Sequence, residues 1–480
     1  MKFVLLWTDL ALWLMAAAGL AYALRVSAQA HLRTTWCRVL RDPVAASAGV
    51  IMALFLLVTL VDSIHLRRAL PTGPGEAAVY DPRTLSLLDL LLERQIDMRE
   101  VSYSVPLGTQ GFKRESVVDA QGAVHRDYPR LRFGGAHLAD PAAQWAGDVA
   151  ARAGLGLAVG LAVAAFLVAL TAAALARHHG GWRHALADLA ADRSFYPLRA
   201  ILATLAAVLL LAGPVIALMP HYHVFGTDRT GNDVLVQALK SVRTAFVIGA
   251  LSTLATLPVA LLLGVLAGYY KGWVDEAIQY VYTTLSSVPN VLLIAACVLM
   301  VQVFFDKNPE LFETAAERSD LKMLLLCVIL GLTGWAGLCR LVRAETLKLR
   351  ELDYVQAATA FGVGDLRIMA RHIVPNVMHL VLITVVLSFS ELILYEAVLT
   401  YVGVGVDPVM NSFGSMINLA RAEMSADPIV WWSFAAAFGF MVGLVLAANL
   451  FADGVRDAFD PKSRSARPRV FLRWTEAGDA

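Results

Sequence analysis

Two glutamates are the first candidates for chemistry, because they interrupt a long apolar stretch. Glu391 and Glu396 lie within Val377–Val402, which is otherwise apolar enough to span a membrane. A carboxylate that faces lipid is costly, so both side chains should face a helix bundle or an aqueous path. Five residues apart, they can share one wide helix face. They are candidates for lining a passage or packing against another subunit, although an interhelical hydrogen bond that only orients helices would also explain them.

Other reactive side chains lack the spacing that known sites require. The sequence contains no G-x-x-x-x-G-K-[ST] phosphate loop, no GxSxG and no HExxH. The four cysteines form no CxxC pair. His221 and His223 can share one side of an extended strand, but a metal would need further ligands, so we expect solvated loop histidines. We therefore predict no catalytic residue, no metal site and no cofactor bound to this chain.

The composition indicates a protein built into a membrane. Of 480 residues, 58% are hydrophobic and 16% are charged, and the mean hydropathy is +0.62. Soluble proteins carry about 25% charged residues, so this composition excludes an ordinary cytosolic enzyme and a disordered chain. A net charge of +1 gives no basic field for nucleic acid.

Nine stretches are long and apolar enough to cross a bilayer, whose hydrocarbon core is about 30 Å thick. They predict an all-α polytopic fold. The stretches are Phe3–Leu24, Pro43–Val61, Ala153–Leu175, Ile201–Met219, Phe246–Gly268, Val288–Phe305, Leu321–Leu338, Val377–Val402 and Val430–Phe451. An amphipathic segment, Asp275–Ser287, leads into the sixth. Trp431 and Trp432 are expected at the membrane interface.

Arginine-rich segments follow the first, third and seventh spans and form the tail. Nine spans place all of them on one side, which should be the cytoplasm, and leave the N-terminus outside. The first span can also be interpreted as a signal peptide, since Ala28-Gln29-Ala30 resembles a cleavage site. Asp9 within it and the long apolar run favour a retained span.

One large hydrophilic segment, 62–150, separates the second and third spans. It is too long for a bare connection. Thr84–Gln95 has leucines at helical spacing, and later glycines and prolines separate short strand-like runs. We predict a small mixed subdomain outside the cytoplasm.

The loop after the seventh span, 351–376, predicts two short helices joined by a tight bend. Ala357 and Ala358 are small, so another surface can approach closely. Gly362 fits a helix end, Asp365 fits the N-cap of the next helix, and Pro375 interrupts the pattern before the eighth span. These features suit a protruding surface that docks onto another protein, although an ordinary interhelical loop explains them equally well.

This loop resembles the EAA motif of ABC-importer permeases, E-A-A-x3-G-x9-I-x-L-P. Gln356-Ala357-Ala358, Gly362 and Pro375 fall in register, with Gln356 in place of Glu. The resemblance implies that the loop couples the chain to an ATPase subunit. The residues it assigns to this coupling are Tyr354, Gln356, Ala357, Ala358, Gly362, Asp365 and Pro375.

Four further segments resemble the dipeptide/oligopeptide/nickel branch of these permeases, of the second-subunit type. Gly226-Thr227-Asp228-x-x-Gly231-Asn232-Asp233 resembles GTDxxGRD, with Asn232 in place of Arg. The other matches are 267–275 with AGYxGGxxD, 396–405 with EAxLSFLGLG, and 453–461 with GDxLRDxLDP. The resemblance covers about 196–463.

The resemblance implies a multi-pass permease of the bacterial inner membrane that imports peptides or related small solutes by alternating access. Its expected partners are a homologous permease, two ATPase subunits that bind ATP and Mg, an extracytoplasmic solute-binding protein and membrane lipid. Two alternatives are an ATP-independent secondary transporter and an assembly or receptor subunit that acts through 62–150.

We divide the chain accordingly into five parts. They are two spans (1–61), the extracytoplasmic subdomain (62–150), a third span with a linker (151–198), the six-span core (199–463) and a basic tail (464–480).

Overall fold

A computed structural model describes residues 2–70, 80–118, 124–176, 181–192, 194–312 and 314–459. Within these ranges nine helices are long and apolar enough to cross a membrane, which confirms the predicted all-α polytopic fold. The spanning helices are α1 (Trp7–Ala28), α3 (Pro43–Asp62), α6 (Pro141–Ala176), α8 (Leu198–Leu218), α9 (Val234–Tyr270), α11 (Asn290–Lys307), α12 (Ala315–Arg350), α15 (Val374–Val402) and α17 (Trp432–Phe459). The five-part division of the chain stays a prediction, and its tail, 464–480, lies outside the described residues.

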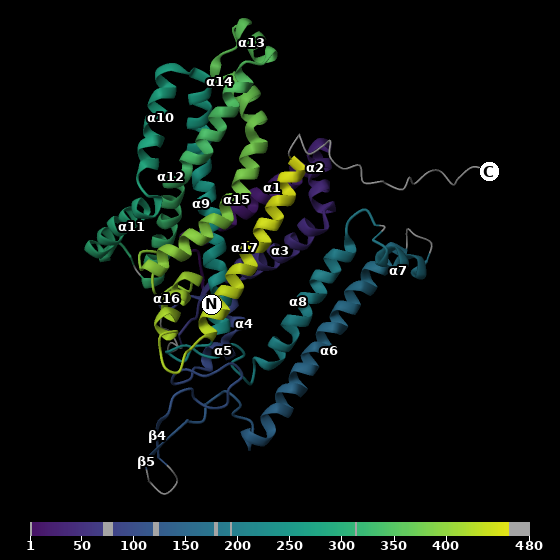
Figure 1. The fold of residues 1–480 in the computed structure, drawn as a ribbon, viewed down its shortest axis with the longest axis vertical. Coiled ribbons are helices and arrows are strands. Elements are labelled where there is room, and N and C mark those ends of the chain that lie inside the picture. The colour runs from purple at the N-terminus through teal and green to yellow at the C-terminus, as the bar shows by residue number, and fades with distance from the viewer. Residues whose placement is uncertain are drawn as a thin grey trace, which may run out of the picture.

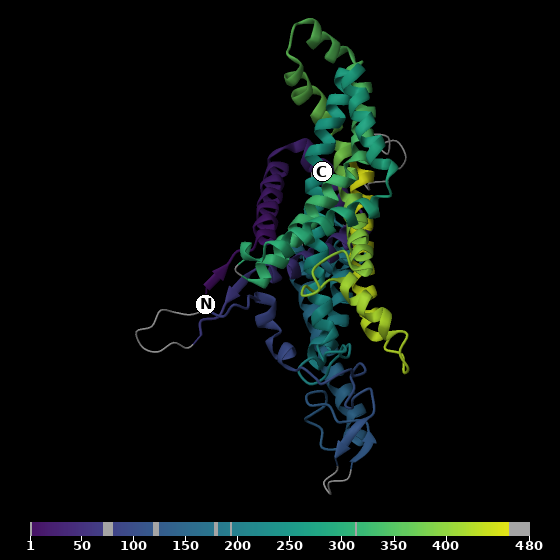
Figure 2. The same ribbon diagram turned by 90° about the vertical axis from the view of Figure 1, so that its left-hand side faces the viewer.

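The molecule is elongated, with different elements at its two ends (Figures 1 and 2). The helices α13 (Asp353–Ala360) and α14 (Asp365–Ile368) lie at one end, and α2 (Ala30–Arg41), α7 (Trp182–Ala190) and the C-terminal end of α17 lie on the same side of the spanning helices. We call this the basic end, because the described parts of the arginine-rich segments after the first, third and seventh spans lie there. The hydrophilic segment between α3 and α6 lies at the other, which we call the subdomain end.

Glycines allow the long helices α9 and α12 to pack closely. A side chain on Gly264 would place its Cβ 2.8 Å from Cβ of Val342, and one on Gly268 would place it 2.6 Å from Cβ of Thr346. Both separations are too short for a real side chain. Gly264 and Gly268 therefore form a small-xxx-small pair that permits a close crossing at the centre of the core.

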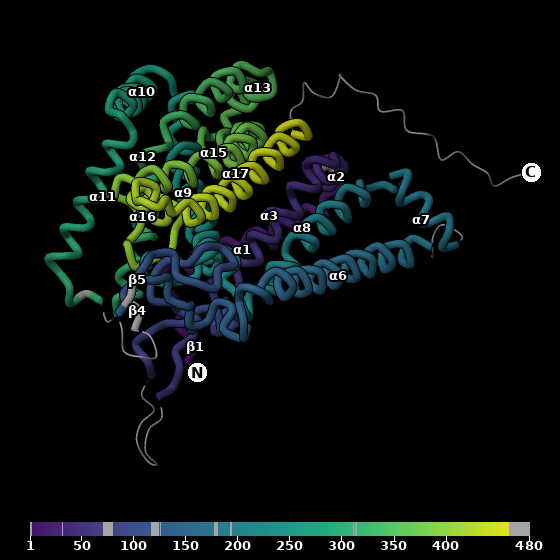
Figure 3. The backbone as a smooth tube through the Cα atoms, turned by 60° about the horizontal axis from the view of Figure 1, so that its bottom comes forward, coloured from purple at the N-terminus to yellow at the C-terminus, as the bar shows by residue number. Residues whose placement is uncertain are grey.

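The helices α6 and α8 form a hairpin, joined by α7, beside the rest of the core (Figure 3). A Cβ on Gly160 would come within 2.6 Å of the backbone oxygen of Leu209, so this pair of helices also needs glycine at its contact. The glycines Gly439 and Gly443, four residues apart on α17, behave differently. Gly439 has no neighbour within 4 Å of its Cβ position, so no close crossing forms there.

The subdomain end combines short strands and helices, as predicted. The strands β1 (Lys2–Val4), β2 (His65–Arg67) and β3 (Leu85–Ser86) form one antiparallel sheet, and β4 (Glu115–Val118) pairs with β5 (Val124–Asp127). The predicted single helix over Thr84–Gln95 is wrong. The chain instead forms β3, then α4 (Leu87–Leu91) and α5 (Glu93–Asp97), because Ser86 and Asp89 build a capping box that starts a helix after the strand.

The remaining helices connect the spans. The amphipathic segment before the sixth span is a separate helix, α10 (Gly272–Ser287), which ends before Pro289. A short 3-10 turn, Pro309–Leu311, follows α11, and a π turn, Met369–Ile373, precedes α15. Helix α16 (Phe413–Glu423) lies toward the subdomain end, between α15 and α17 (Figure 1).

Candidate coupling loop and membrane core

The loop between α12 and α15 folds as two short helices around a bend. Helix α13 ends at Ala360 and is followed by Gly362, whose φ of +74° is a left-handed conformation that favours glycine. Val355, on the inner face of α13, is buried in an apolar cluster, and Ala358 and Val363 pack against the same cluster. The bend is therefore held against the ends of the spanning helices.

Polar contacts brace this loop from the neighbouring helices. Tyr269 donates its hydroxyl hydrogen to Asp365 Oδ1 at 2.9 Å, and Arg350 donates to the backbone oxygen of Tyr269 at 2.5 Å. Lys271 pairs with Glu351 at 2.7 Å. The prediction that Asp365 caps α14 is wrong: Gly364 is the N-cap, and Asp365 is the first helical residue, whose carboxylate instead accepts from α9.

The outer surface of the loop is apolar and exposed. Phe361 is 87% exposed and Leu366 75% exposed, although both are large apolar side chains. The two predicted contact alanines differ, since Ala357 is exposed whereas Ala358 is half-buried. Gln356 is exposed and donates to the backbone oxygen of Glu351 at 3.2 Å.

Pro375 does not interrupt the helix, contrary to the prediction. It lies in the first turn of α15, directly after the π turn Met369–Ile373. The π turn before it keeps the chain helical, so the helix runs without a break over Asp365–Val402. Asn376 donates to the hydroxyl oxygen of Tyr354 at 3.2 Å and thereby fixes α13 to this helix.

The GTDxxGRD-like segment is a structural junction at the subdomain end. Thr227 is fully buried, accepts from the backbone N–H of Ser104 at 2.7 Å and donates to the backbone oxygen of Ser102 at 2.8 Å. Its backbone oxygen accepts from the indole of Trp432 at 2.9 Å. Trp432 is thus buried in the core, and its predicted position in an interfacial belt is wrong.

The other residues of this segment shape the turn before α9. Asp228 accepts from the backbone N–H of Thr230 and of Asn232 at 2.8 and 2.9 Å. Gly226 and Gly231 have φ of +71° and +79°, and a side chain on Gly231 would collide with the backbone of Glu100. The glycines of the segment therefore allow its backbone to contact the backbone of the subdomain directly.

A buried charge cluster completes this junction. His223 is 1% exposed, with Nδ1 2.9 Å from Asp233 and Nε2 3.6 Å from Glu100. Glu100 accepts from the backbone N–H groups of Arg132 and Phe133 at 2.9 and 2.8 Å, while Asp233 also caps α9. Our expectation of a solvated His223 is wrong.

The pKa values in this cluster follow from its partners. Burial alone would lower the pKa of His223, but the hydrogen bond to Asp233 and the nearby carboxylate of Glu100 raise it to about 9. Burial likewise opposes ionisation of Glu100, yet the nearby imidazole of His223 and hydrogen bonds from backbone N–H groups lower the pKa of Glu100 to about 2. Both groups are therefore charged at neutral pH, and each stabilises the other.

The two glutamates of α15 lie on different faces of the helix. The prediction that they share one face is therefore wrong. Glu396 is fully buried and accepts from Thr400 Oγ1 at 2.8 Å. Glu391 is exposed on the outside of the helix. Only Glu396 therefore packs within this chain.

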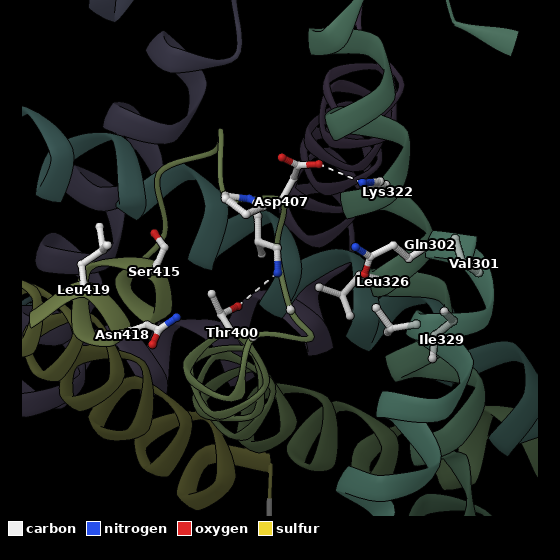
Figure 4. Close-up of a pocket in the computed structure, with 15 residues that line it drawn as sticks. Val301, Gln302, Lys322, Leu326, Ile329, Thr400, Asp407, Ser415, Asn418 and Leu419 are labelled. Carbon is white, nitrogen blue, oxygen red and sulfur yellow. Dashed lines mark hydrogen bonds and ion pairs between the residues drawn. The ribbon is translucent and has the colours of Figure 1, made fainter. Parts of the chain in front are cut away.

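A pocket of about 210 Å3 lies at the end of α15 nearest the subdomain (Figure 4). Lys322 of α12 and Asp407 form an ion pair of 3.0 Å at its edge. Thr400 accepts from the backbone N–H of Val406 at 3.1 Å. Thr400 thereby links the buried carboxylate of Glu396 to the turn that lines the pocket.

A second buried cluster joins the first helix to the core, and its only sign in the local sequence is the unusual Asp9. Arg243 of α9 is 5% exposed and lies 2.6 Å from Asp9 of α1. His65 Nδ1 lies 2.7 Å from the other oxygen of Asp9. The backbone N–H of Thr8 donates to Asp320 of α12 at 2.9 Å. Asp9 lies 234 positions from its partner Arg243, so no short motif could reveal the pair.

A bidentate pair also explains the aspartate of the AGYxGGxxD-like segment. Arg343 of α12 contacts both carboxylate oxygens of Asp275 at 2.5 and 2.6 Å. These hydrogen bonds lower the pKa of Asp275. The pair fastens α10 to α12 near the basic end.

Comparison with known proteins agrees with these features. Residues 260–465 match the family described as binding-protein-dependent transport system inner membrane component. The oligopeptide transport system permease protein OppC of Mycobacterium tuberculosis is 32% identical over 58% of this chain and 96% of its own length. OppC of Escherichia coli is 30% identical over 50% of this chain and 73% of its own length. The glutathione transport system permease protein GsiD of Pectobacterium atrosepticum is 32% identical over 51% of this chain and 74% of its own length.

The family match, 260–465, contains the braced loop and the glycines of α9 at its crossing with α12, on a polytopic helical core. The chain therefore belongs to the binding-protein-dependent inner membrane components, the permease subunits of ABC importers.

Proposed function

We propose that this permease imports peptides across the bacterial inner membrane, with its basic end in the cytoplasm. The proposed cargo rests on the relatives named for oligopeptide and glutathione transport. A second homologous permease, two ATPase chains and an extracytoplasmic solute-binding protein complete the transporter. ATP and Mg bind to the ATPase chains, because this sequence has no phosphate-binding loop.

The exposed coupling loop is the observation that carries this proposal. Phe361 and Leu366 of the loop are exposed apolar side chains, and the helices α13 and α14 of the loop lie at the extreme of the basic end (Figure 1). Exposed aromatic residues of this kind are frequent anchors of protein interfaces. Ala357 lies beside them and permits close approach of a partner. The proposed partner surface is a groove of the ATPase chain.

The loop is also built to transmit movement. Asp365–Val402 is one continuous helix, and Tyr269 and Asn376 fasten the loop to the spanning helices. A displacement of α13 would therefore tilt α15 rather than deform a flexible connection. Such a rigid link suits alternating access driven from the ATPase.

A substitution on the outer surface of α13 tests the coupling role. Ala357→Arg adds a long charged side chain at an exposed position, so the chain should fold normally while its contact with the ATPase is lost. ATP-driven peptide uptake in proteoliposomes should fall at least about tenfold, which corresponds to about 1.4 kcal/mol of lost contact energy. Ala358→Arg is less informative, because Ala358 packs inward.

Ala187→Arg on α7 is the matched control, since Ala187 is an exposed alanine of another short helix at the basic end. It should leave uptake and recovery of the ATPase chains unchanged. Normal uptake by Ala357→Arg would contradict the coupling role. It would favour the secondary transporter, in which this loop has no partner.

A further inference from the structure

One face of α15 combines apolar side chains with a single carboxylate. Four exposed residues recur at intervals that place them on the same side of the helix. They are Leu387, Glu391, Leu394 and Val398. The opposite side, including Ile393, packs in the core of the chain. The carboxylate of Glu391 is therefore the polar feature of an otherwise apolar outward face.

Glu391 lies deep in the spanning region. From Glu391 to the end of α15 at Val402 is about 16 Å along the helix, or about half of the hydrocarbon thickness. The next residue, Leu392, belongs to the same packed cluster as Leu330 of α12, a helix whose charged residues lie toward its two ends. Contact of Glu391 with lipid at this depth would be costly.

Glu391 has no ion pair or hydrogen bond with any residue that the structure describes. This distinguishes it from Glu396, whose carboxylate accepts from Thr400 inside the core. A second permease or an aqueous passage must therefore cover Glu391. Burial of an ion pair between subunits would remove both charges from water at large cost, whereas a passage leaves the carboxylate hydrated.

Glu391 lies on α15, the helix that follows the coupling loop, and this position favours an aqueous passage as its surroundings. The coupling loop leads directly into α15, so movement of α13 is carried to Glu391 along one rigid helix. A side chain that contacts passing cargo is well placed there, because its exposure changes with each cycle of the ATPase.

From these observations we propose that Glu391 lines the translocation path and favours cargo with cationic groups, such as the amine of a peptide or a lysine side chain. The inference rests on the proposed peptide import. It assigns charge selectivity to the permease itself, in addition to the binding protein.

Uptake by the complete transporter tests this assignment. The probes are trilysine, trialanine and triglutamate, each supplied with the binding protein and ATP to proteoliposomes. Glu391→Gln should lower the uptake of trilysine relative to triglutamate about fivefold, a difference of about 1 kcal/mol. Glu391→Asp keeps the charge and should restore most of the ratio. Leu394→Ala, on the same face, should leave the ratio unchanged.

Three outcomes would overturn the proposal. Equal changes for the three peptides would show that Glu391 has no role in charge selection. Loss of the second permease from purified Glu391→Gln complexes would show that Glu391 pairs with that subunit instead. Absence of ATP-driven uptake of all three probes by the wild type would contradict peptide import itself. Normal uptake by the wild type, with an unchanged ratio of trilysine to triglutamate uptake in Glu391→Gln, would contradict only the role of Glu391.

Discussion

At the scale of single residues, buried charges decide how the subdomain is joined to the core. His223 connects Asp233, which caps α9, to Glu100, which holds the backbone of the subdomain. Removal of one member would leave a charge buried without its partner, which is strongly destabilising. We therefore regard His223 as a structural ion rather than a solvated loop residue.

The stability of this junction should depend on pH. The pKa of His223 is about 9 in the fold against 6.5 without its partners. Its contribution is therefore complete below about pH 6.5 and is lost as the pH rises through 9, amounting to about 3 kcal/mol. The thermal midpoint of the purified chain should fall over this range, and His223→Gln should lose that part of the dependence.

His184→Gln is the matched control, because His184 is exposed on α7 at the basic end. This variant should keep the pH dependence of the wild type. An equal fall of the midpoint in His223→Gln and in the wild type would contradict a stabilising charge at His223.

Residue patterns predicted some of these roles and not others. Gly362 was predictable, because a glycine after a helical segment indicates a left-handed helix end. His223 was not, because its partner Glu100 is far away in the chain and only the folded subdomain brings them together. Glu391 and Glu396 show the same limit, since spacing alone did not reveal which glutamate is buried.

At the scale of elements, the first helix is fastened to the core by polar contacts at one end. Much of α1 is exposed along its length, whereas Thr8, Asp9 and Leu12 are buried. Asp9 contacts Arg243 of α9, and Thr8 contacts Asp320 of α12. A helix that neutralises a buried arginine of the core should remain in the mature protein.

Substitution of Asp9 should therefore destabilise the chain. Asp9→Ala leaves Arg243 buried with weaker compensation, and we expect a loss of about 3 kcal/mol. The measurement is the thermal midpoint in detergent, with Leu14→Ala as control because Leu14 is exposed on the same helix. An unchanged midpoint in Asp9→Ala, or an intact mass that lacks the first 30 residues, would support cleavage of a signal peptide instead.

The spanning helices were the most predictable elements. Their length follows from the thickness of the bilayer, so apolar runs predicted all nine. The subdomain was less predictable, since Leu85–Leu91 has leucines at helical spacing but begins in a strand. Pro375 was misjudged for a related reason: the π turn that accommodates it leaves no signature in the sequence.

At the scale of the whole molecule, the two ends are suited to different partners. The basic end presents the coupling loop, and the other end presents a subdomain held firmly against α9 (Figure 2). A firmly held subdomain beside the predicted six-span core suggests contact with the binding protein or the second permease. Its exposed residues should therefore lie near one of them during transport.

Photocrosslinking tests this contact in the assembled transporter. A photoreactive residue at Arg94 or at Tyr128, which is 41% exposed, should capture the binding protein or the second permease. The same photoreactive residue in place of Trp182 of α7, at the basic end, should not capture the partner that the subdomain captures. Recovery of neither partner from both sites would indicate an insertion without a role in assembly.

Reconstituted uptake tests the central claim most directly. Proteoliposomes are prepared with the complete transporter, and then with the ATPase chains, the binding protein or ATP left out in turn. The account predicts peptide uptake only when all three are present with this chain, and no ATP hydrolysis by the purified chain alone. Peptide uptake without ATP or without the binding protein, or ATP hydrolysis by the single chain, would contradict it.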